Sequence, residues 1–361
     1  MLIRTLQKYI FVSQGLAVLT LLDLQTEKLS QVLCHFLPHV KLFSRKAYIF
    51  TPFISIMGTV DVTQTPTTFS QERFLNDVRK TAEAINAPYS EHAVLEVLKA
   101  FEGCLTDEAV IWRTTSRPND KLNYRISIRS GLDTVALAIK AGFINPDNHL
   151  ARLIKSWSSL YNGDTEHGCD FDASFAGVAK TWVNLKSLRP VDDVLNTDHV
   201  PDVVRAHGPT FHSLGLKVVR FVAADYNGNT MNLYFRAPGP ITRDQAAKLV
   251  NLAQCPPPTE QEFQDMRTYL DPDGYPFATT IEYATGTIRR VAFYALDIPE
   301  GKTPTTVNDR MQKFFDVAPS YDRKICRIVS WSFGLGGSKY LKAESSYVGE
   351  SGVLLKIMRT Q

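Results

Sequence analysis

The sequence has no CxxC pair and no zinc-type spacing. Its five cysteines are scattered along the chain, at Cys34, Cys104, Cys169, Cys255 and Cys326. This pattern excludes a disulfide framework or a structural zinc site and indicates buried thiols in a reducing compartment. We therefore expect a cytoplasmic protein.

Runs of basic residues and long apolar runs are missing as well. The formal net charge is only +3 over 361 residues, and nucleic-acid-binding proteins carry denser basic patches than this. The apolar stretch 11–22 is too short and too interrupted to span a membrane. We expect neither a nucleic acid nor a membrane as partner. The hydrophobic content of 44% is ordinary for a globular protein.

Acidic residues are rare in the first 56 positions, which contain only two, Asp23 and Glu27. No small-residue cleavage site follows the apolar stretch at a convincing distance, so a secretory signal is not indicated. Met57 then opens a segment typical of a protein N-terminus. We predict a dispensable extension or gene-model artefact at 1–56 and one globular domain at 57–361. A targeting or membrane-associating role for 1–56 is the alternative.

The stretch 216–237 is the clearest structural signal that the sequence contains. Two β-rich runs flank Asn227-Gly228, a pair that favours the positive φ angles of a tight hairpin turn. In the second run Met231, Leu233 and Phe235 point one way, and polar residues alternate with them on the other side.

Similar patterns recur every 45 to 60 residues or so, with helical segments between them. Strand patterns occupy 109–129, 176–188, 216–236, 275–296 and 324–348, and helical patterns occupy 70–86, 91–102, 133–141, 149–160, 242–252 and 308–315. A propeller would not carry a helix in every repeat. We therefore predict an α+β fold, a closed barrel of about ten antiparallel strands with helices outside.

Helices on the outside require the apolar strand faces to point outward, so the polar faces line the lumen. By strand alternation the lumen then contains several cations: Arg113, Arg125, Lys180, Arg220, Arg290 and Lys342. Buried cations without counter-charge each cost several kcal/mol. They need a polyanion, and a diphosphate suits their number.

Ten short motifs, in order and suitably spaced over about 57–349, resemble the soluble aromatic prenyltransferases of the ABBA (αββα) barrel type. The nearest branch dimethylallylates 4-hydroxyphenylpyruvate and has fungal relatives. The motifs are Trp-Arg-Thr-Thr-Ser (112–116), Leu-Asn-Tyr-Arg (122–125), Trp-Ser-Ser-Leu-Tyr (157–161), Asp-Phe-Asp-Ala (170–173), Ala-Lys-Thr-Trp (179–182), Asn-Leu-Tyr-Phe-Arg (232–236), Thr-Gly-Thr-Ile-Arg-Arg-Val (285–291), Val-Ala-Pro-Ser (317–320), Trp-Ser-Phe-Gly (331–334) and Lys-Ala-Glu-Ser-Ser-Tyr (342–347).

The resemblance implies a Friedel-Crafts alkylation in secondary metabolism. A prenyl diphosphate, most simply dimethylallyl diphosphate, ionises to an allyl cation that a small aromatic ring attacks. The implied diphosphate ligands are Arg113, Lys180, Arg220, Arg290, Lys342 and Asn232. Tyr234 and Trp182 correspond to family positions that shield the cation through their ring faces.

At the acceptor end the resemblance assigns an arginine, Arg125, and a glutamate, Glu344, that binds the acceptor hydroxyl. The acceptor pocket is expected to include Ser127, Pro276, Ala278 and Tyr294. Ser127 and Pro276 depart from the residues of the pyruvate-type enzyme. This difference favours another phenolic ring, such as a dihydroxynaphthalene.

We expect no cofactor and no requirement for Mg²⁺. Some family members hold Mg²⁺ through an aspartate where this chain has Asn123, and an amide is a poor sole anchor for a hard divalent cation. The run Asp192-Asp193-Val194-Leu195-Asn196 resembles the DDxxD box of terpenoid synthases, but it falls in a predicted loop and has no third carboxylate. Asp271-Pro272-Asp273-Gly274 reads as a turn.

Two other classes of function remain open at this point. One is a non-catalytic β-barrel carrier of an anionic aromatic ligand, and the other is a Mg²⁺-dependent isoprenoid cyclase. The acceptor, the ring position and the C5 or C10 donor are not fixed by the sequence. We expect a monomer. The family continues further beyond the position of Tyr347, so a final helix is expected to be missing at one mouth of the barrel.

The composition of residues 1–56 generates a first prediction. A chain that begins at Met57 should fold and keep the activity of the full chain, because the regular pattern starts near Thr68. Soluble yield, thermal unfolding and turnover of the two proteins would be compared. Loss of soluble expression on truncation would contradict the division.

Overall fold

The structure is a computed structural model that describes residues 12–13, 16–17, 68–102, 108–128 and 132–350. The chain separates into two units, residues 1–64 and 65–361. In the first, β1 (Val12–Ser13) pairs with β2 (Leu16–Ala17). The second contains the barrel. Within the described ranges, no helix combines the length and the apolar character needed to cross a membrane.

Ten antiparallel strands close into a barrel in the order β10-β11-β12-β3-β4-β5-β6-β7-β8-β9. The strands form five hairpins: β3 (Ala109–Thr115) with β4 (Asn123–Ile128), β5 (Glu166–Asp172) with β6 (Phe175–Pro190), β7 (Val218–Asp225) with β8 (Thr230–Ala237), β9 (Tyr275–Glu282) with β10 (Ile288–Ala295), and β11 (Arg327–Gly334) with β12 (Ser338–Val348). The predicted fold is confirmed, and closure leaves none of these ten strands with an unpaired edge.

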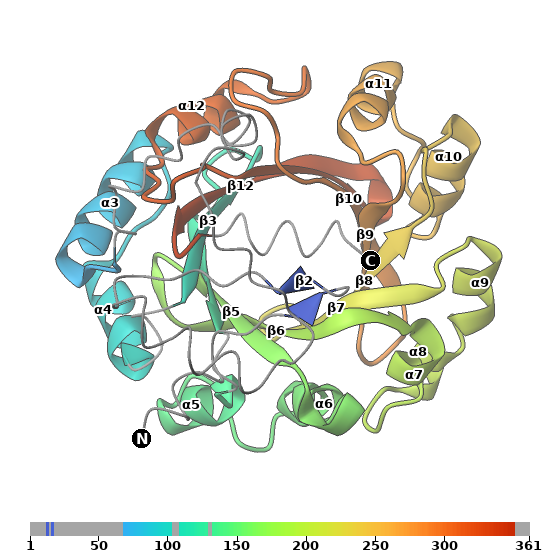
Figure 1. Cartoon of the computed structure of the whole chain (residues 1–361), viewed down its shortest axis with the longest axis horizontal. Coiled ribbons are helices and arrows are strands. Elements are labelled where there is room, and N and C mark those ends of the chain that lie inside the picture. The colour runs from blue at the N-terminus through green and yellow to red at the C-terminus, as the bar shows by residue number, and fades with distance from the viewer. Residues whose placement is uncertain (1–11, 14–15, 18–67, 103–107, 129–131, 351–361) are drawn as a thin grey trace, which may run out of the picture. The chain divides into compact units, whose positions relative to one another are not determined.

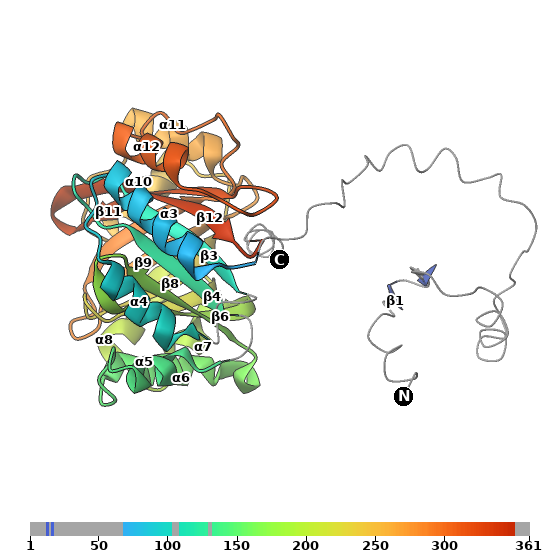
Figure 2. The same cartoon turned by 90° about the vertical axis from the view of Figure 1, so that its left-hand side faces the viewer.

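Helices surround the barrel on its outer side (Figures 1 and 2). They are α3 (Gln71–Ala84), α4 (Glu91–Ala100), α5 (Thr134–Lys140), α6 (His149–Ser158), α7 (Val191–Leu195), α8 (Asp202–Arg205), α9 (Gly208–Ser213), α10 (Arg243–Asn251), α11 (Glu260–Tyr269) and α12 (Asp309–Val317), with short 3-10 turns η2 (Leu160–Gly163) and η3 (Leu335–Gly337). Side-chain caps fix several helix starts. Ser70 accepts from the Arg73 amide, and Asn308 accepts from the Met311 amide.

The apolar residues form two clusters, one on each side of the barrel wall. The larger cluster lies between the strands and the helices, and it contains Met231, Leu233 and Phe235 of β8. The smaller cluster contains Tyr234 of the same strand, together with residues of β6, β7, β9, β10 and β11. Strand alternation therefore separates an outer core from a lumen, as the sequence predicts.

The sequence pattern missed one barrel strand and several helices. β5, Glu-His-Gly-Cys-Asp-Phe-Asp, contributes only two apolar residues, Cys169 and Phe171, to the outer core. Because its lumen face is acidic, it lacks an ordinary strand signal. The unpredicted helices are α7, α8, α9 and α11. For α11, a capping box between Thr259 and Glu262 was the available signal.

Two hairpin turns show local backbone constraints. The β7–β8 turn lies where predicted, but its positive φ falls on Asn229, at 48°, and not on Asn227 or Gly228. In the β9–β10 turn Gly286 has a φ of 71°, and a Cβ there would lie 2.6 Å from the carbonyl oxygen of Val203. Glycine is therefore required where this turn meets α8.

Candidate active site

Four of the predicted cations converge in the lumen: Arg113 on β3, Lys180 on β6, Arg290 on β10 and Lys342 on β12. Burial is the largest influence on the pKa of Lys342, which is held well below its ordinary value, and the charges of Arg290 and Lys180 lower it further. Burial likewise lowers the pKa of Lys180 to about 8, although Asp225 opposes the shift from 3.9 Å. The cluster is therefore short of negative charge.

Polar groups without a protein partner accompany these cations. Among the described residues, the buried Asn232 Nδ2, Ser330 Oγ and Ser332 Oγ have no hydrogen-bond partner. Asn232 Oδ1 accepts from Thr280 Oγ1 at 2.8 Å, which leaves the amide NH₂ directed elsewhere. Ser330 is the register partner of Lys342. Buried polar groups are rarely left without a partner, so these groups suit a bound ligand rich in acceptor oxygens.

The Arg290 guanidinium is fixed by neutral partners rather than by a carboxylate. Its Nη1 donates to the Tyr340 hydroxyl at 2.7 Å, and its Nη2 donates to Thr280 Oγ1 at 3.0 Å. Both bonds orient the side chain without neutralising its charge. Arg290 is therefore held in place with its charge available to an anion.

Aromatic rings line the lumen next to the cations. The ring centroids of Trp182 and Tyr234 are 4.5 Å apart, and those of Tyr234 and Tyr294 are 5.9 Å apart. Lys180 lies 5.3 Å from the Trp182 ring centroid, and Lys342 lies 5.8 Å from that of Tyr294. Burial, with the charge of Glu344, raises the pKa of Tyr294 to about 12. Its hydroxyl therefore stays protonated at neutral pH and cannot serve as a base.

A chain of ion pairs leads from the cations to the predicted acceptor residues. Arg113 Nη1 lies 2.8 Å from Asp170 Oδ2, and Arg125 Nε lies 2.7 Å from Asp170 Oδ1. Arg125 Nη1 continues to Glu344 Oε2 at 3.2 Å. The Arg125 guanidinium also lies 4.2 Å from the Trp182 ring centroid. The structure thus brings Arg125, Glu344 and Trp182 together with the diphosphate candidate Arg113.

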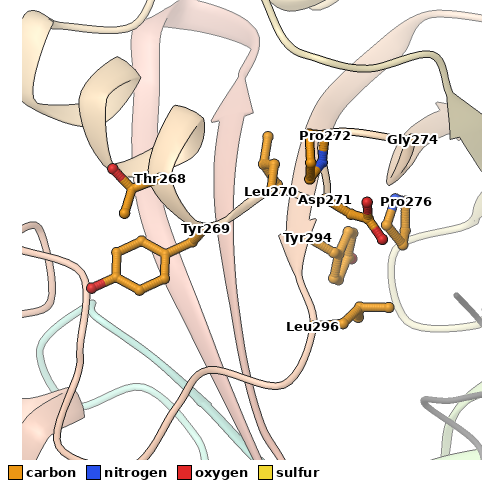
Figure 3. A pocket seen from close by; sticks show the side chains of 9 residues that line it. All are labelled: Thr268, Tyr269, Leu270, Asp271, Pro272, Gly274, Pro276, Tyr294 and Leu296. Carbon is orange, nitrogen blue, oxygen red and sulfur yellow. The ribbon is translucent and has the colours of Figure 1, made fainter.

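A cavity of about 240 Å³ lies beside Tyr294, one of the aromatic residues of the lumen (Figure 3). Pro276, Tyr294 and Leu296 contribute lumen-facing side chains to it, and Asp271 and Pro272 contribute from the loop that follows α11. Ala278 lies two residues further along β9 in the smaller apolar cluster. Ser127, half-buried on β4 beside Gly168, does not line this cavity.

Arg220 does not join the cation cluster. A bulge between Val219 and Phe221 interrupts the alternation of β7, and Arg220 Nη1 donates to the Lys186 carbonyl at 3.0 Å. Burial and the nearby charge of Arg236 lower the pKa of Arg220. It lines a small cavity with Tyr234, Arg236 and Pro276. Arg220 lies near the start of β7, five residues before Asp225, the register partner of Lys180, so the structure places it at a different level of the barrel from Lys180.

The aspartate pair Asp192-Asp193 lies outside the lumen, on α7 rather than in the predicted loop. Asp192 contacts His212 Nε2 at 3.0 Å, and Asp193 accepts from the Tyr161 hydroxyl at 2.9 Å. The Asp271–Gly274 turn is confirmed, with the Gly274 amide donating to the Asp271 carbonyl at 3.2 Å. In the part of the chain that the structure describes, no group of three or more His, Cys, Asp or Glu residues is arranged to hold a metal ion.

Several lumen residues were not singled out by the sequence analysis. Asp170, which is 1% exposed, is the most connected of them. It belongs to the motif Asp-Phe-Asp-Ala (170–173), but strand alternation alone does not assign a role to a carboxylate among cations. Ser330, Ser332 and Tyr340 follow the same alternation as Lys342 and could have been found by it.

Comparison with known proteins gives the same classification as the geometry. A family model described as aromatic prenyltransferase Orf2 matches residues 69–358. The chain belongs to this family, and it is therefore a transferase that acts on aromatic compounds. The resemblance stated from the motifs is confirmed.

Three relatives show how much of the chain the likeness covers. An aromatic prenyltransferase of Arthroderma otae is 52% identical over 288 residues, which are 80% of this chain and 91% of the relative. Another, of Sclerotinia sclerotiorum, is 46% identical over 82% of this chain and 97% of its own. The 4-hydroxyphenylpyruvate 3-dimethylallyltransferase of Streptomyces niveus is 40% identical over 78% of this chain and 86% of the relative.

The lowered pKa values generate a second prediction. An anion among the cations favours the protonated lysines, so diphosphate binding should take up protons, and affinity should fall as the pH rises through about 8, the pKa of Lys180. The limit is about tenfold per pH unit for each lysine that must be protonated. Methyl diphosphate is a suitable probe, since its last phosphate ionisation, with a pKa of about 6, is nearly complete at pH 7.

Calorimetric titration at pH 7, 8 and 9.5, in buffers of different ionisation enthalpy, measures both the affinity and the proton uptake. Lys180→Met should bind more weakly at pH 7 and show a smaller dependence on pH. Affinity for methyl diphosphate that stays constant between pH 7 and 9.5 would contradict the assignment.

Proposed function

We propose that this enzyme transfers a dimethylallyl group from its diphosphate to a ring carbon of a phenolic or hydroxynaphthalene-type aromatic, without a metal ion, as a step of secondary metabolism. The observation that carries the proposal is the position of four cations beside three aromatic rings in one lumen. The similarity to the 4-hydroxyphenylpyruvate 3-dimethylallyltransferase of Streptomyces niveus supports the dimethylallyl donor and a phenolic acceptor.

Donor ionisation is the first step. The bond between the allylic carbon and oxygen breaks, and both electrons leave with the diphosphate. Arg113, Lys180, Arg290 and Lys342, with the Asn232 amide, receive the negative charge that develops. Preorganised donors of this kind each contribute about 2–4 kcal/mol to lowering a barrier. Because Arg220 lies apart from them, we leave it out of this set.

The allyl cation is stabilised between ring faces. Trp182 and Tyr234 offer π electrons without a strong nucleophile, and such contacts contribute about 0.5–2 kcal/mol each. The raised pKa of Tyr234, caused chiefly by burial, keeps its hydroxyl neutral. A neutral phenol does not compete with the acceptor ring for the cation.

Attack and proton loss complete the reaction. The acceptor ring forms the new carbon–carbon bond while its hydroxyl lies near Glu344 and Arg125. A proton then leaves, and the Glu344 carboxylate, which is 5% exposed, accepts it. Pro276, Ala278 and Tyr294 line the acceptor region, with Ser127 on the opposite wall. The enzyme works as a cytoplasmic monomer in this proposal.

Family membership sets aside the carrier, because the chain is a transferase. It also sets aside the isoprenoid cyclase, whose aspartate box would have to be Asp192-Asp193 on the outside of the barrel. Neither alternative is supported by a separate observation in the described residues.

A third prediction follows for metal dependence. Purified enzyme with dimethylallyl diphosphate and a panel of phenols, naphthalenediols and 4-hydroxyphenylpyruvate should release diphosphate and form a prenylated product in excess EDTA, because Asn123 supplies no carboxylate for Mg²⁺. Mass spectrometry identifies the product. Asn123→Asp should gain a response to added Mg²⁺. Turnover that stops in EDTA and returns with Mg²⁺ would refute metal independence.

A fourth prediction separates the donor and acceptor roles. Lys342→Ala should slow donor ionisation by a factor of about 10²–10³, the usual cost of one removed charge-stabilising donor. Glu344→Gln should slow prenylation while it spares donor affinity, and it should raise solvolysis to the prenyl alcohol, because the cation waits longer for its ring.

Diphosphate release and prenylated product are measured separately for both variants. The decisive comparison is donor affinity. If Glu344→Gln weakens it as much as Lys342→Ala does, the two roles have been assigned wrongly.

A further inference from the structure

Asp170 occupies an unusual position among the lumen side chains. It is a carboxylate, 1% exposed, on the strand next to Lys180. Its two oxygens are shared between Arg113 and Arg125, at 2.8 and 2.7 Å. One of these arginines belongs to the proposed diphosphate set and the other to the proposed acceptor set. A single carboxylate therefore connects both substrate regions.

The strand register shows that this pairing is not the simplest one available. Glu344 is the direct register partner of Arg113 on the neighbouring strand. Arg113 nevertheless makes its ion pair with Asp170, which lies two strands away across β4. Glu344 keeps a single ion pair among those found in the described chain, to Arg125 at 3.2 Å. Asp170 thus takes up charge that Glu344 would otherwise neutralise.

The two arginines depend on Asp170 in different ways. Arg125 Nε donates to Asp170 Oδ1, and this bond leaves Nη1 directed to Glu344 and the guanidinium group near the Trp182 ring. For Arg113, Asp170 is the source of the counter-charge. Burial alone would raise the pKa of Asp170, but Arg125 and Arg113 outweigh it and hold the value at about 2. The carboxylate stays ionised at every pH at which the enzyme would be assayed.

We propose that Asp170 is a positioning residue of the prenyl transfer, which orients Arg125 for the acceptor and keeps Glu344 free to accept the proton, at the expense of diphosphate affinity. The inference rests on the proposed function. Its physical signature is two effects of opposite direction. Loss of the negative charge should strengthen diphosphate binding, because the cation cluster becomes more positive. The same change should impair binding and reaction of the acceptor, because Arg113 and Arg125 would then both pair with Glu344.

The test uses Asp170→Asn, which keeps the shape and removes the charge. Calorimetry at pH 6.5 with dimethylallyl thiolodiphosphate, a non-reacting donor analogue, should show about 3- to 10-fold tighter binding, the effect of one removed charge at moderate screening. In turnover assays kcat/KM for the acceptor should fall by about 10- to 100-fold, as expected for misplaced reacting groups. If Asp170 had a purely structural role, its substitution would lower both the analogue affinity and the acceptor kcat/KM.

Asp172→Asn is the matched control. Asp172 is also a buried carboxylate of β5, two residues along, but it serves the hairpin turn by accepting from the Ser174 amide and pairs with Lys121. Analogue affinity and acceptor kcat/KM should both stay within about twofold of the wild type, since a turn hydrogen bond survives the change to an amide.

Asp170→Glu covers the case in which the asparagine variant does not fold. It keeps the charge but lengthens the side chain, so analogue affinity should stay near the wild-type value while acceptor kcat/KM falls. Weaker analogue binding in Asp170→Asn, or unchanged acceptor kcat/KM in both variants, would overturn the proposal. Wild-type protein that binds the analogue but prenylates no acceptor would instead refute the proposed function, because the binding measurement needs no turnover.

Discussion

Mutual repulsion between buried cations inside a closed sheet is the constraint on which this molecule depends. Closure and an outer layer of helices turn the polar strand faces inward, away from most of the solvent. Lys180 and Lys342 therefore lie in a low-dielectric space where burial and neighbouring charge lower both pKa values. Such a cluster is unfavourable in the empty protein and favourable around an anion. The outer core stabilises the barrel, and the lumen is left free to be complementary to a ligand.

The lumen also separates two kinds of chemistry over a short distance. In the proposed reaction the cations would accept charge from the leaving group, whereas the rings of Trp182, Tyr234 and Tyr294 would face the carbon fragment that remains. Water is the competing nucleophile for such a fragment, and apolar neighbours such as Ala278 and Ala292, each at most 3% exposed, leave little polar surface to hold it. The same alternation that directs charge inward at one level of the barrel directs alanine inward at the next.

Much of this arrangement could be predicted from the sequence, because a strand has a period of two. The period places Arg113, Lys180, Arg290 and Lys342 on the lumen face. The turn residues between the strands mark where each hairpin lies. Prediction failed where the period was hidden or broken. β5 has an acidic lumen face and so resembles a loop, and alternation does not show that Arg220 lies five residues along β7 from Asp225, the register partner of Lys180. The capping box of α11 was present but followed a proline run.

Partners are harder to predict than faces, because alternation fixes the direction of a side chain but not which charge it meets. Register alone would pair Arg113 with Glu344, and the carboxylate that we propose as the base would then be held by an arginine that we propose for the diphosphate. The structure resolves the conflict with a second carboxylate from a strand that carries little sequence signal. In the proposed mechanism Glu344 can act as the base beside these cations because another anion neutralises the nearest of them, Arg113. Asp170 supplies that charge, so the strand hardest to recognise in the sequence is also the one that lets the two halves of the site coexist.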